Sequence, residues 1–156
     1  MKIEVGSIAP DFSLYSSDRE KVSLGDYKHK TVVLLFFPLA FTSVCTKELC
    51  NIRDNIGFYN NTKATILAIS VDSPQTLAKF KEDQKLNFLL LSDFNKTVSE
   101  KYGCLYEIFS MDMKGVSKRS AFVIDREGRI RYTEVLENAS GEPDYEAIEN
   151  CLRLLN

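Results

Sequence analysis

Two cysteines, Cys45 and Cys50, follow a long apolar run in the segment FFPLAFTSVCTKELC. Thiols at this spacing could ligate a metal, form a disulfide, or act as a nucleophile and a second thiol that reacts with it. Each of these chemistries requires a different set of neighbouring residues. The rest of the sequence can therefore be used to choose between them.

A metal site lacks the other ligands that it would need. Such sites usually take three or four close ligands, often with a Cys-x-x-Cys spacing. No such spacing occurs here, and the only histidine, His29, lies in a charged segment ahead of the apolar run. We therefore expect no bound metal.

A permanent disulfide between Cys45 and Cys50 is disfavoured by helix geometry. Residues five apart in an intact helix have Cα atoms about 8.6 Å apart, beyond the ~7 Å limit for bridging.

The first residues, MKIEVG, have no apolar leader, so we expect a cytoplasmic protein. In that reducing compartment the four cysteines are more often catalytic or buried than bridged.

The helix expected after the apolar run presents its two cysteines to different surroundings. At about 100° per residue from Cys45, Leu49 lies near 40° on a core-facing stripe that continues to Tyr59, whereas Cys50 lies near 140° on the polar flank. Thr42 or Ser43 is the expected N-cap. Cys45 then lies in the first turn, where free N–H groups and the helix dipole favour a thiolate. A nucleophile explains this placement, whereas two unrelated thiols leave it without a purpose.

Strands and helices that alternate along the chain must position this helix. TVVLLFF (31–37) and TILAISV (65–71) are predicted strands covered on both faces, and Ser73 and Pro74 begin a helix after the second. Further expected elements are a strand over 88–93, a helix over 96–103, one hairpin over 119–135 that turns at 125–129, and a C-terminal helix with the stripe Ile148, Cys151, Leu152 and Leu155. This order predicts an α/β protein with a central mixed β-sheet flanked by helices.

Length and charge restrict the partners. A chain of 156 residues fits one domain, 1–156. Twenty basic and 22 acidic side chains give a net charge of −2 without a long run of one sign, so no nucleic-acid or anionic membrane surface is indicated. The apolar run 31–41 is too short to span a bilayer and is broken by Pro38. We expect small molecules or proteins as partners.

Several segments resemble those of one protein family and occur along the chain in the same order as in that family. FFPLAFTSVC resembles the Pro-x-x-x-Thr-x-x-Cys signature of the peroxiredoxins, with Pro38, Thr42 and Cys45 on the motif positions. KRSAFVID is similar to the strand that bears their active-site arginine, here Arg119, and GSIAPDFSL, ILAISVDSP, LLSDF and IDREGRIRY extend the similarity. The resemblance implies a thioredoxin-like fold and a thiol-dependent peroxidase. Its substrates would be hydrogen peroxide, organic hydroperoxides or peroxynitrite, and it would need no metal or organic cofactor.

The resemblance also implies roles for single residues. Cys45 would attack the peroxide, Thr42 would orient it, Arg119 and backbone N–H groups would stabilise developing charge, and Pro38 would shield the site from water. Glu48 lies one helical turn after Cys45, where its charge alone would oppose a thiolate. We therefore expect an ion pair between Glu48 and the site arginine, Arg119.

The second cysteine is where two subgroups of the family differ. CTKELC resembles the Cys-Thr-x-Glu-x-Cys pattern of the PrxQ (bacterioferritin comigratory protein) subgroup, which implies that Cys50 resolves Cys45 as a disulfide for a thioredoxin- or glutaredoxin-like reductant. FFPLAFTSVC and LLSDF instead resemble the AhpE group, many of whose members use an external thiol. A one-cysteine peroxidase and a thiol-based peroxide sensor stay open as alternatives.

The expected assembly is a monomer or a homodimer. Cys104 and Cys151 are expected to be small buried residues.

Overall fold

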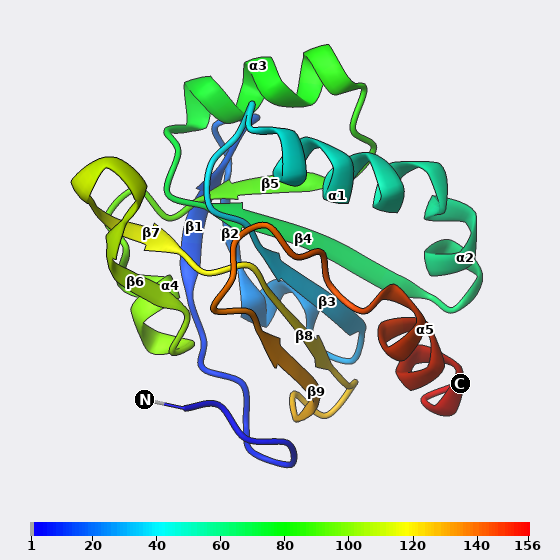
Figure 1. Cartoon of the computed structure of the whole chain (residues 1–156). Coiled ribbons are helices and arrows are strands. Elements are labelled where there is room, and N and C mark those ends of the chain that lie inside the picture. Colours follow the sequence, from blue (N-terminus) through cyan, green and yellow to red (C-terminus); the bar gives the residue numbers. More distant parts are fainter. Residues whose placement is uncertain (1) are drawn as a thin grey trace.

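A seven-stranded mixed β-sheet forms the centre of the molecule, as the expected α/β class requires (Figure 1). The computed structural model describes residues 2–156. In the order β2-β1-β5-β4-β3-β8-β9, the strands are β1 (Ser13–Ser16), β2 (Lys21–Ser23), β3 (Thr31–Phe36), β4 (Ala64–Ser70), β5 (Leu89–Ser92), β8 (Ser120–Ile124) and β9 (Ile130–Val135). β3, β4 and β5 are parallel, and the remaining pairings are antiparallel. A separate two-stranded sheet consists of β6 (Leu105–Phe109) and β7 (Met113–Ser117).

Helices cover both faces of the sheet. They are α1 (Ser43–Asp54), α2 (Ile56–Asn61), α3 (Pro74–Gln84), α4 (Thr97–Lys101) and α5 (Tyr145–Leu154), with 3-10 turns η1 (Leu24–Tyr27) and η2 (Ser110–Asp112). Side chains of α1, α2, α3 and α5 share one core cluster, whereas α4 and the N-terminal segment contribute to the other. Within residues 2–156 no helix has the length and apolar character needed to cross a bilayer.

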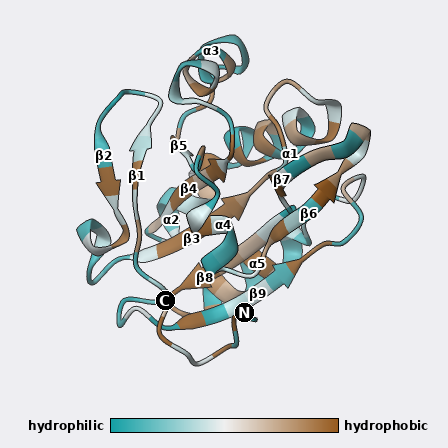
Figure 2. Ribbon diagram, turned by 90° about the vertical axis from the view of Figure 1, so that its left-hand side faces the viewer, coloured by the Kyte–Doolittle hydropathy of each residue, from teal (hydrophilic) through white to brown (hydrophobic). Residues whose placement is uncertain are grey.

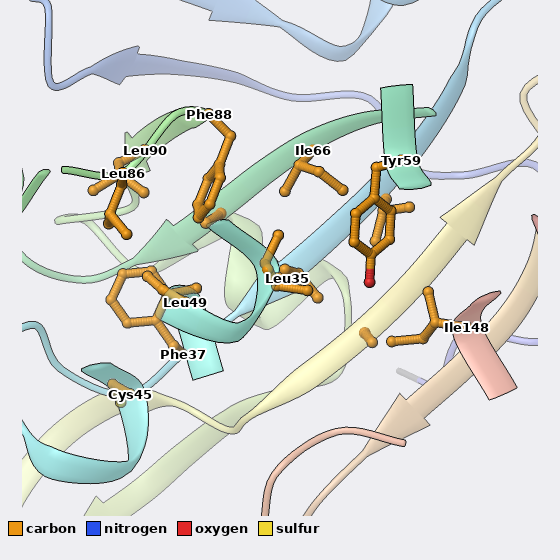
Figure 3. Packing of buried hydrophobic residues seen from close by; sticks show 14 of the residues in the cluster. Leu35, Phe37, Cys45, Leu49, Tyr59, Ile66, Leu86, Phe88, Leu90 and Ile148 are labelled. Carbon is orange, nitrogen blue, oxygen red and sulfur yellow. The ribbon is translucent and has the colours of Figure 1, made fainter. Parts of the chain in front are cut away.

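Strand β3 lies between the two core clusters. Val33 and Leu35 point into the cluster under α1, and Val32 and Leu34 point into the cluster on the other face. All four side chains are buried, which explains why this strand is a continuous apolar run without polar alternation. Figure 2 shows the apolar colour along the central strands, and Figure 3 shows Leu35 beside Leu49 of α1. The sheet therefore holds α1 through burial of its apolar stripe.

Two local predictions from turn and cap residues are confirmed. The Ser73 side chain accepts a hydrogen bond from Thr76 N at 3.1 Å, and Pro74 is the first residue of α3. The β8–β9 hairpin turns after Asp125, with Gly128 at φ +81°, a conformation that glycine adopts without strain. Both signals are local, so they are readable without knowledge of the tertiary fold.

The helix after β3 is shorter than expected. The predicted core-facing stripe ran from Cys45 to Tyr59, but α1 ends at Asp54 and α2 begins at Ile56. Asn55 between them has φ −111° and ψ 17°, and its side-chain amide donates to Asn51 O at 2.8 Å. This local hydrogen bond competes with regular helix. Tyr59 is still fully buried.

The prediction of a single antiparallel hairpin was wrong. The β1–β2 and β6–β7 pairs are also antiparallel hairpins. β1 and β2 are only four and three residues long and alternate with exposed polar positions such as Ser13 and Lys21. β6 and β7 lie outside the main sheet, and no residue of β6 is buried. None of these strands forms the apolar run by which β3 and β4 were recognised.

Candidate active site

The loop between β3 and α1 is held by the neighbouring parallel strand. Phe37 N donates to Ile69 O of β4 at 3.0 Å, and Ala40 N donates to the Asp72 carboxylate at 2.8 Å, just beyond the end of β4. Phe41 then takes a left-handed conformation with φ +67°. Pro38 is buried in this loop. The loop therefore fixes where α1 starts.

Cys45 is the third residue of α1 and lies under the surface. Its side chain is 1% exposed and belongs to the same core cluster as Phe37 and Leu49. Figure 3 shows it at the start of the helix, near Phe37. The predicted inward direction is thus confirmed.

Arg119 reaches Cys45 from the start of β8, the strand next to β3 in the sheet. β8 pairs with β3 so that Ser120 lies opposite Phe36, and Arg119 directly precedes Ser120. Its Nη1–H group donates to Cys45 Sγ at 3.4 Å and to Glu48 Oε1 at 2.7 Å. Arg119 is 2% exposed and Glu48 fully buried. The predicted ion pair between Glu48 and Arg119 is therefore present.

Burial changes the protonation of this pair. Loss of water raises the pKa of Glu48 to about 7, and the positive charge of Arg119 only partly opposes that rise. Glu48 Oε2 has no hydrogen-bond partner among residues 2–156, which adds to the cost of its charge. Burial also acts to lower the pKa of Arg119, but Glu48 and Cys45 hold that pKa above its ordinary value. The guanidinium therefore stays charged beside the thiol.

The loop between β9 and α5 supports Arg119 through contacts that sequence reasoning missed. Arg119 Nη2 donates to the Ala139 carbonyl at 2.9 Å. Glu142 of the same loop accepts a 2.7 Å hydrogen bond from the Tyr145 hydroxyl and pairs with Lys47 of α1 at 3.1 Å. A backbone carbonyl acts independently of its side chain, so no residue type could have revealed the Ala139 contact. The Glu142 contacts depend on the folded loop.

Thr42 is the N-cap of α1 by conformation but not by its side chain. It is extended, with φ −90° and ψ 154°, and its carbonyl accepts from Thr46 N at 2.9 Å. Its hydroxyl donates to Leu39 O at 2.7 Å and so does not cap the helix N–H groups. The capping position was predicted correctly, but the side-chain cap was not found. The exposed hydroxyl oxygen keeps lone pairs that can accept from a substrate.

Cys50 lies on a different side of α1 from Cys45, as predicted. Its side chain is partly buried, and its Sγ donates to Gln84 Oε1 of α3 at 3.5 Å. The polar flank of α1 therefore faces α3 here rather than open water. All four cysteines are free thiols in this state.

Cys104 and Cys151 have surroundings that suit structural residues. Cys104 is fully buried, and burial raises its pKa to about 12. Cys151 is partly buried on α5, and burial again raises its pKa. The expected burial is thus confirmed for Cys104, whereas Cys151 is only partly buried. Neither environment favours the thiolate, which is the nucleophilic form.

Other hollows and ligand clusters do not compete with this site. Residues 2–156 contain no group of three or more Cys, His, Asp or Glu side chains arranged to hold a metal. A cavity of about 580 Å³ opens near the start of β3, between Val32, Tyr27 and Ile124. Its walls contain none of the predicted site residues. This cavity is therefore separate from the cluster of Cys45, Glu48 and Arg119 at the start of α1.

The amino-acid sequence is similar to that of a known protein family and of several of its members. Residues 5–133 match the model of the AhpC/TSA family. The chain is 40% identical over 136 residues to alkyl hydroperoxide reductase E of Mycobacterium tuberculosis, covering 85% of this chain and 86% of that protein. It is 34% identical over 153 residues to peroxiredoxin Bcp of Escherichia coli, covering 97% and 96%.

Structural comparison extends the similarity to the whole fold. The crystal structure of peroxidoxin BcpB from Mycobacterium tuberculosis matches with a TM-score of 0.88 at 28% identity, covering 99% of both chains. This match confirms the thioredoxin-like fold expected from the sequence.

Proposed function

Since the chain belongs to the AhpC/TSA family, the thiol peroxidases known as peroxiredoxins, we propose that Cys45 is its peroxide-reducing group. The substrates that we propose are hydrogen peroxide and organic hydroperoxides, with peroxynitrite as a further oxidant. The observation that carries the proposal is the 3.4 Å hydrogen bond from Arg119 to Cys45 Sγ in a buried site. A cation donating to sulfur favours the thiolate.

The first step oxidises Cys45. Its thiolate attacks one peroxide oxygen, an S–O bond forms, and the O–O bond breaks. The sulfur becomes a sulfenic acid, and the other oxygen leaves with the bonding electrons and takes up a proton to give water or an alcohol. Two electrons thus pass from sulfur to the peroxide.

Ionisation of the thiol is too small an effect to carry this step alone. An ordinary cysteine thiol is about 3% ionised at pH 7, so full ionisation raises the thiolate population only about 30-fold. Further acceleration must come from groups that bind the transition state more strongly than the ground state. In this proposal Arg119 and the first-turn N–H groups of α1 would stabilise the charge that develops on the leaving oxygen. Thr42 would orient the peroxide, and Pro38 would keep water away.

The second step joins the two cysteines of α1. Cys50 attacks the sulfenic sulfur, an S–S bond forms, and the hydroxyl group leaves as water. A thioredoxin- or glutaredoxin-like dithiol then reduces the disulfide and is itself oxidised. Residues five apart in a helix are too distant to bridge, so α1 must unwind locally between Cys45 and Cys50.

Rapid-quench mass spectrometry of the reduced protein tests both steps. After one equivalent of peroxide, we expect sulfenylated Cys45 first and a Cys45–Cys50 disulfide later. Cys45→Ser should abolish peroxide consumption, and unchanged consumption would overturn the peroxidase assignment of Cys45. Cys50→Ser should stop at the sulfenic acid. A lasting sulfenic acid in the unaltered protein would favour an external thiol, and absence of turnover with any reductant would favour a sensor.

We also propose a cellular compartment and an oligomeric state for the enzyme. Four free thiols and a need for a dithiol reductant support a reducing compartment such as the cytoplasm. We propose a monomer or a homodimer, which sedimentation of the reduced and oxidised protein would distinguish.

A further inference from the structure

Gln84 contacts Cys50 from the last residue of α3. Its Oε1 atom accepts from Cys50 Sγ at 3.5 Å, and its backbone carbonyl accepts from Arg53 Nη1 at 2.6 Å. Asn87, just beyond α3, donates to Arg53 O at 3.3 Å. Both Cys50 and Gln84 are partly buried at this contact. The end of α3 is thus tied to α1 at two neighbouring points.

The Cys50–Gln84 contact and the Arg53–Gln84 contact respond differently when α1 unwinds. A Cys45–Cys50 bond requires Cys50 Sγ to leave Gln84 and approach Cys45, since the intact helix holds the two residues too far apart. Arg53 lies beyond Cys50, outside the segment that must unwind. It can therefore keep Gln84 in place while the Cys50 contact breaks.

We propose that Gln84 is a positioning residue for Cys50: it holds this thiol in its helical place and so sets the rate of disulfide formation, with Arg53 anchoring Gln84. The inference rests on the proposed resolving role of Cys50. The chemistry is that of the second step above, in which the Cys50 thiol and the Cys45 sulfenic acid condense with release of water. Gln84 takes no part in bond making and acts only on the position of Cys50.

Gln84→Ala removes the acceptor and leaves a good helix former at the end of α3. We expect the second phase of the reaction, which is independent of peroxide concentration, to become roughly two- to tenfold faster, as loss of one hydrogen bond predicts. The first phase, which is proportional to peroxide, should not change. Because the chain has no tryptophan, rapid quenching with an alkylating reagent and peptide mass mapping follows both phases directly.

Two further variants separate positioning from general stability. Gln84→Glu keeps an oxygen acceptor at the same place, so its second phase should be no faster than that of the unaltered protein. Gln75→Ala makes the same replacement at the exposed other end of α3, and it should change neither phase. An equal acceleration in Gln75→Ala would overturn the proposal, since it would show a general effect of loosening α3.

The remaining outcomes distinguish this proposal from the one on which it rests. If the unaltered protein forms the disulfide and Gln84→Ala forms it at the same or a lower rate, Gln84 does not restrain Cys50 and only this inference fails. If the unaltered protein forms no Cys45–Cys50 bond at all, the resolving role of Cys50 fails, and the role of Gln84 fails with it.

Discussion

Arg119 Nη1 lies 2.7 Å from Glu48 Oε1 and 3.4 Å from Cys45 Sγ, so one donor group serves a carboxylate and a thiol on successive turns of the same helix. Arg119 comes from a separate part of the chain, and it is itself held by the Ala139 carbonyl. Because its position is restrained on both sides, small changes in this guanidinium should affect chemistry more than folding.

Arg119→Lys tests the geometry of this cation rather than its charge. Lysine keeps the positive charge but has no planar fork, so it cannot reproduce the contacts to Cys45, Glu48 and Ala139 together. We expect the second-order rate constant for Cys45 oxidation to fall about 10²- to 10³-fold, as for loss of a preorganised charge-stabilising donor. Arg131→Lys serves as the control. Arg131 pairs with Asp125, which follows the opposite end of β8 from Arg119, so this variant should oxidise Cys45 at the normal rate. A normal rate in Arg119→Lys would contradict the proposed role.

Glu48 gives a pH dependence of stability with a definite sign. Burial raises its pKa in the folded protein to about 7 from an ordinary value of 4.5, so the folded state binds a proton more tightly than the unfolded state. This contribution is fully present below pH 4.5 and is lost as the pH rises through 7. The unaltered protein should therefore lose stability, on the order of 3 kcal/mol, relative to Glu48→Gln between pH 5 and pH 8.

Urea unfolding of both proteins across this range measures that difference. At pH 5 the two proteins should be similar in stability, because the protonated Glu48 carboxyl is neutral and, like the glutamine amide, accepts from Arg119 through a carbonyl oxygen. The quantity tested is how the difference in free energy of unfolding between the two proteins changes with pH. A difference that stays constant, or grows in the opposite direction, would show that Glu48 does not carry the raised pKa.

Thr42 should act through its hydroxyl. Thr42→Val has nearly the same shape but cannot accept a hydrogen bond from a peroxide, and we expect it to slow Cys45 oxidation at least about tenfold. Thr42→Ser restores the oxygen and should recover most of the rate. Since Thr42 caps α1 with its backbone, both variants should fold normally. Equal rates in the two variants would remove the hydroxyl from the mechanism.

Cys104 should take no part in catalysis. It is fully buried and burial raises its pKa to about 12, so little thiolate forms near neutral pH. In the native protein at pH 8, iodoacetamide should leave Cys104 unmodified, and peptide mass mapping would show it. Modification of Cys104 at the rate seen for Cys50 would contradict this picture. Cys104→Ala should keep the normal rate of peroxide reduction.

Most of the central sheet was predictable because its signals are local. β3 and β4 are continuous apolar runs, and α3 carries its cap and its proline in the sequence itself. β6 and β7 were not predictable in this way, because they pair with each other outside the sheet and bury few side chains. The break between α1 and α2 at Asn55 depends on a side-chain hydrogen bond rather than on the apolar pattern.

By itself, the sequence determined that Cys45 points into the core and that Cys50 does not, because both lie on one helix and helical periodicity separates their faces. It also indicated, by family resemblance, which arginine would meet Cys45. Only the tertiary structure decided how they meet, since Arg119 is 74 residues away from Cys45 and reaches it through the pairing of β8 with β3. The contacts of Ala139 and Gln84 likewise exist only after packing, because they depend on the spatial meeting of a loop and a helix end with α1 and β8.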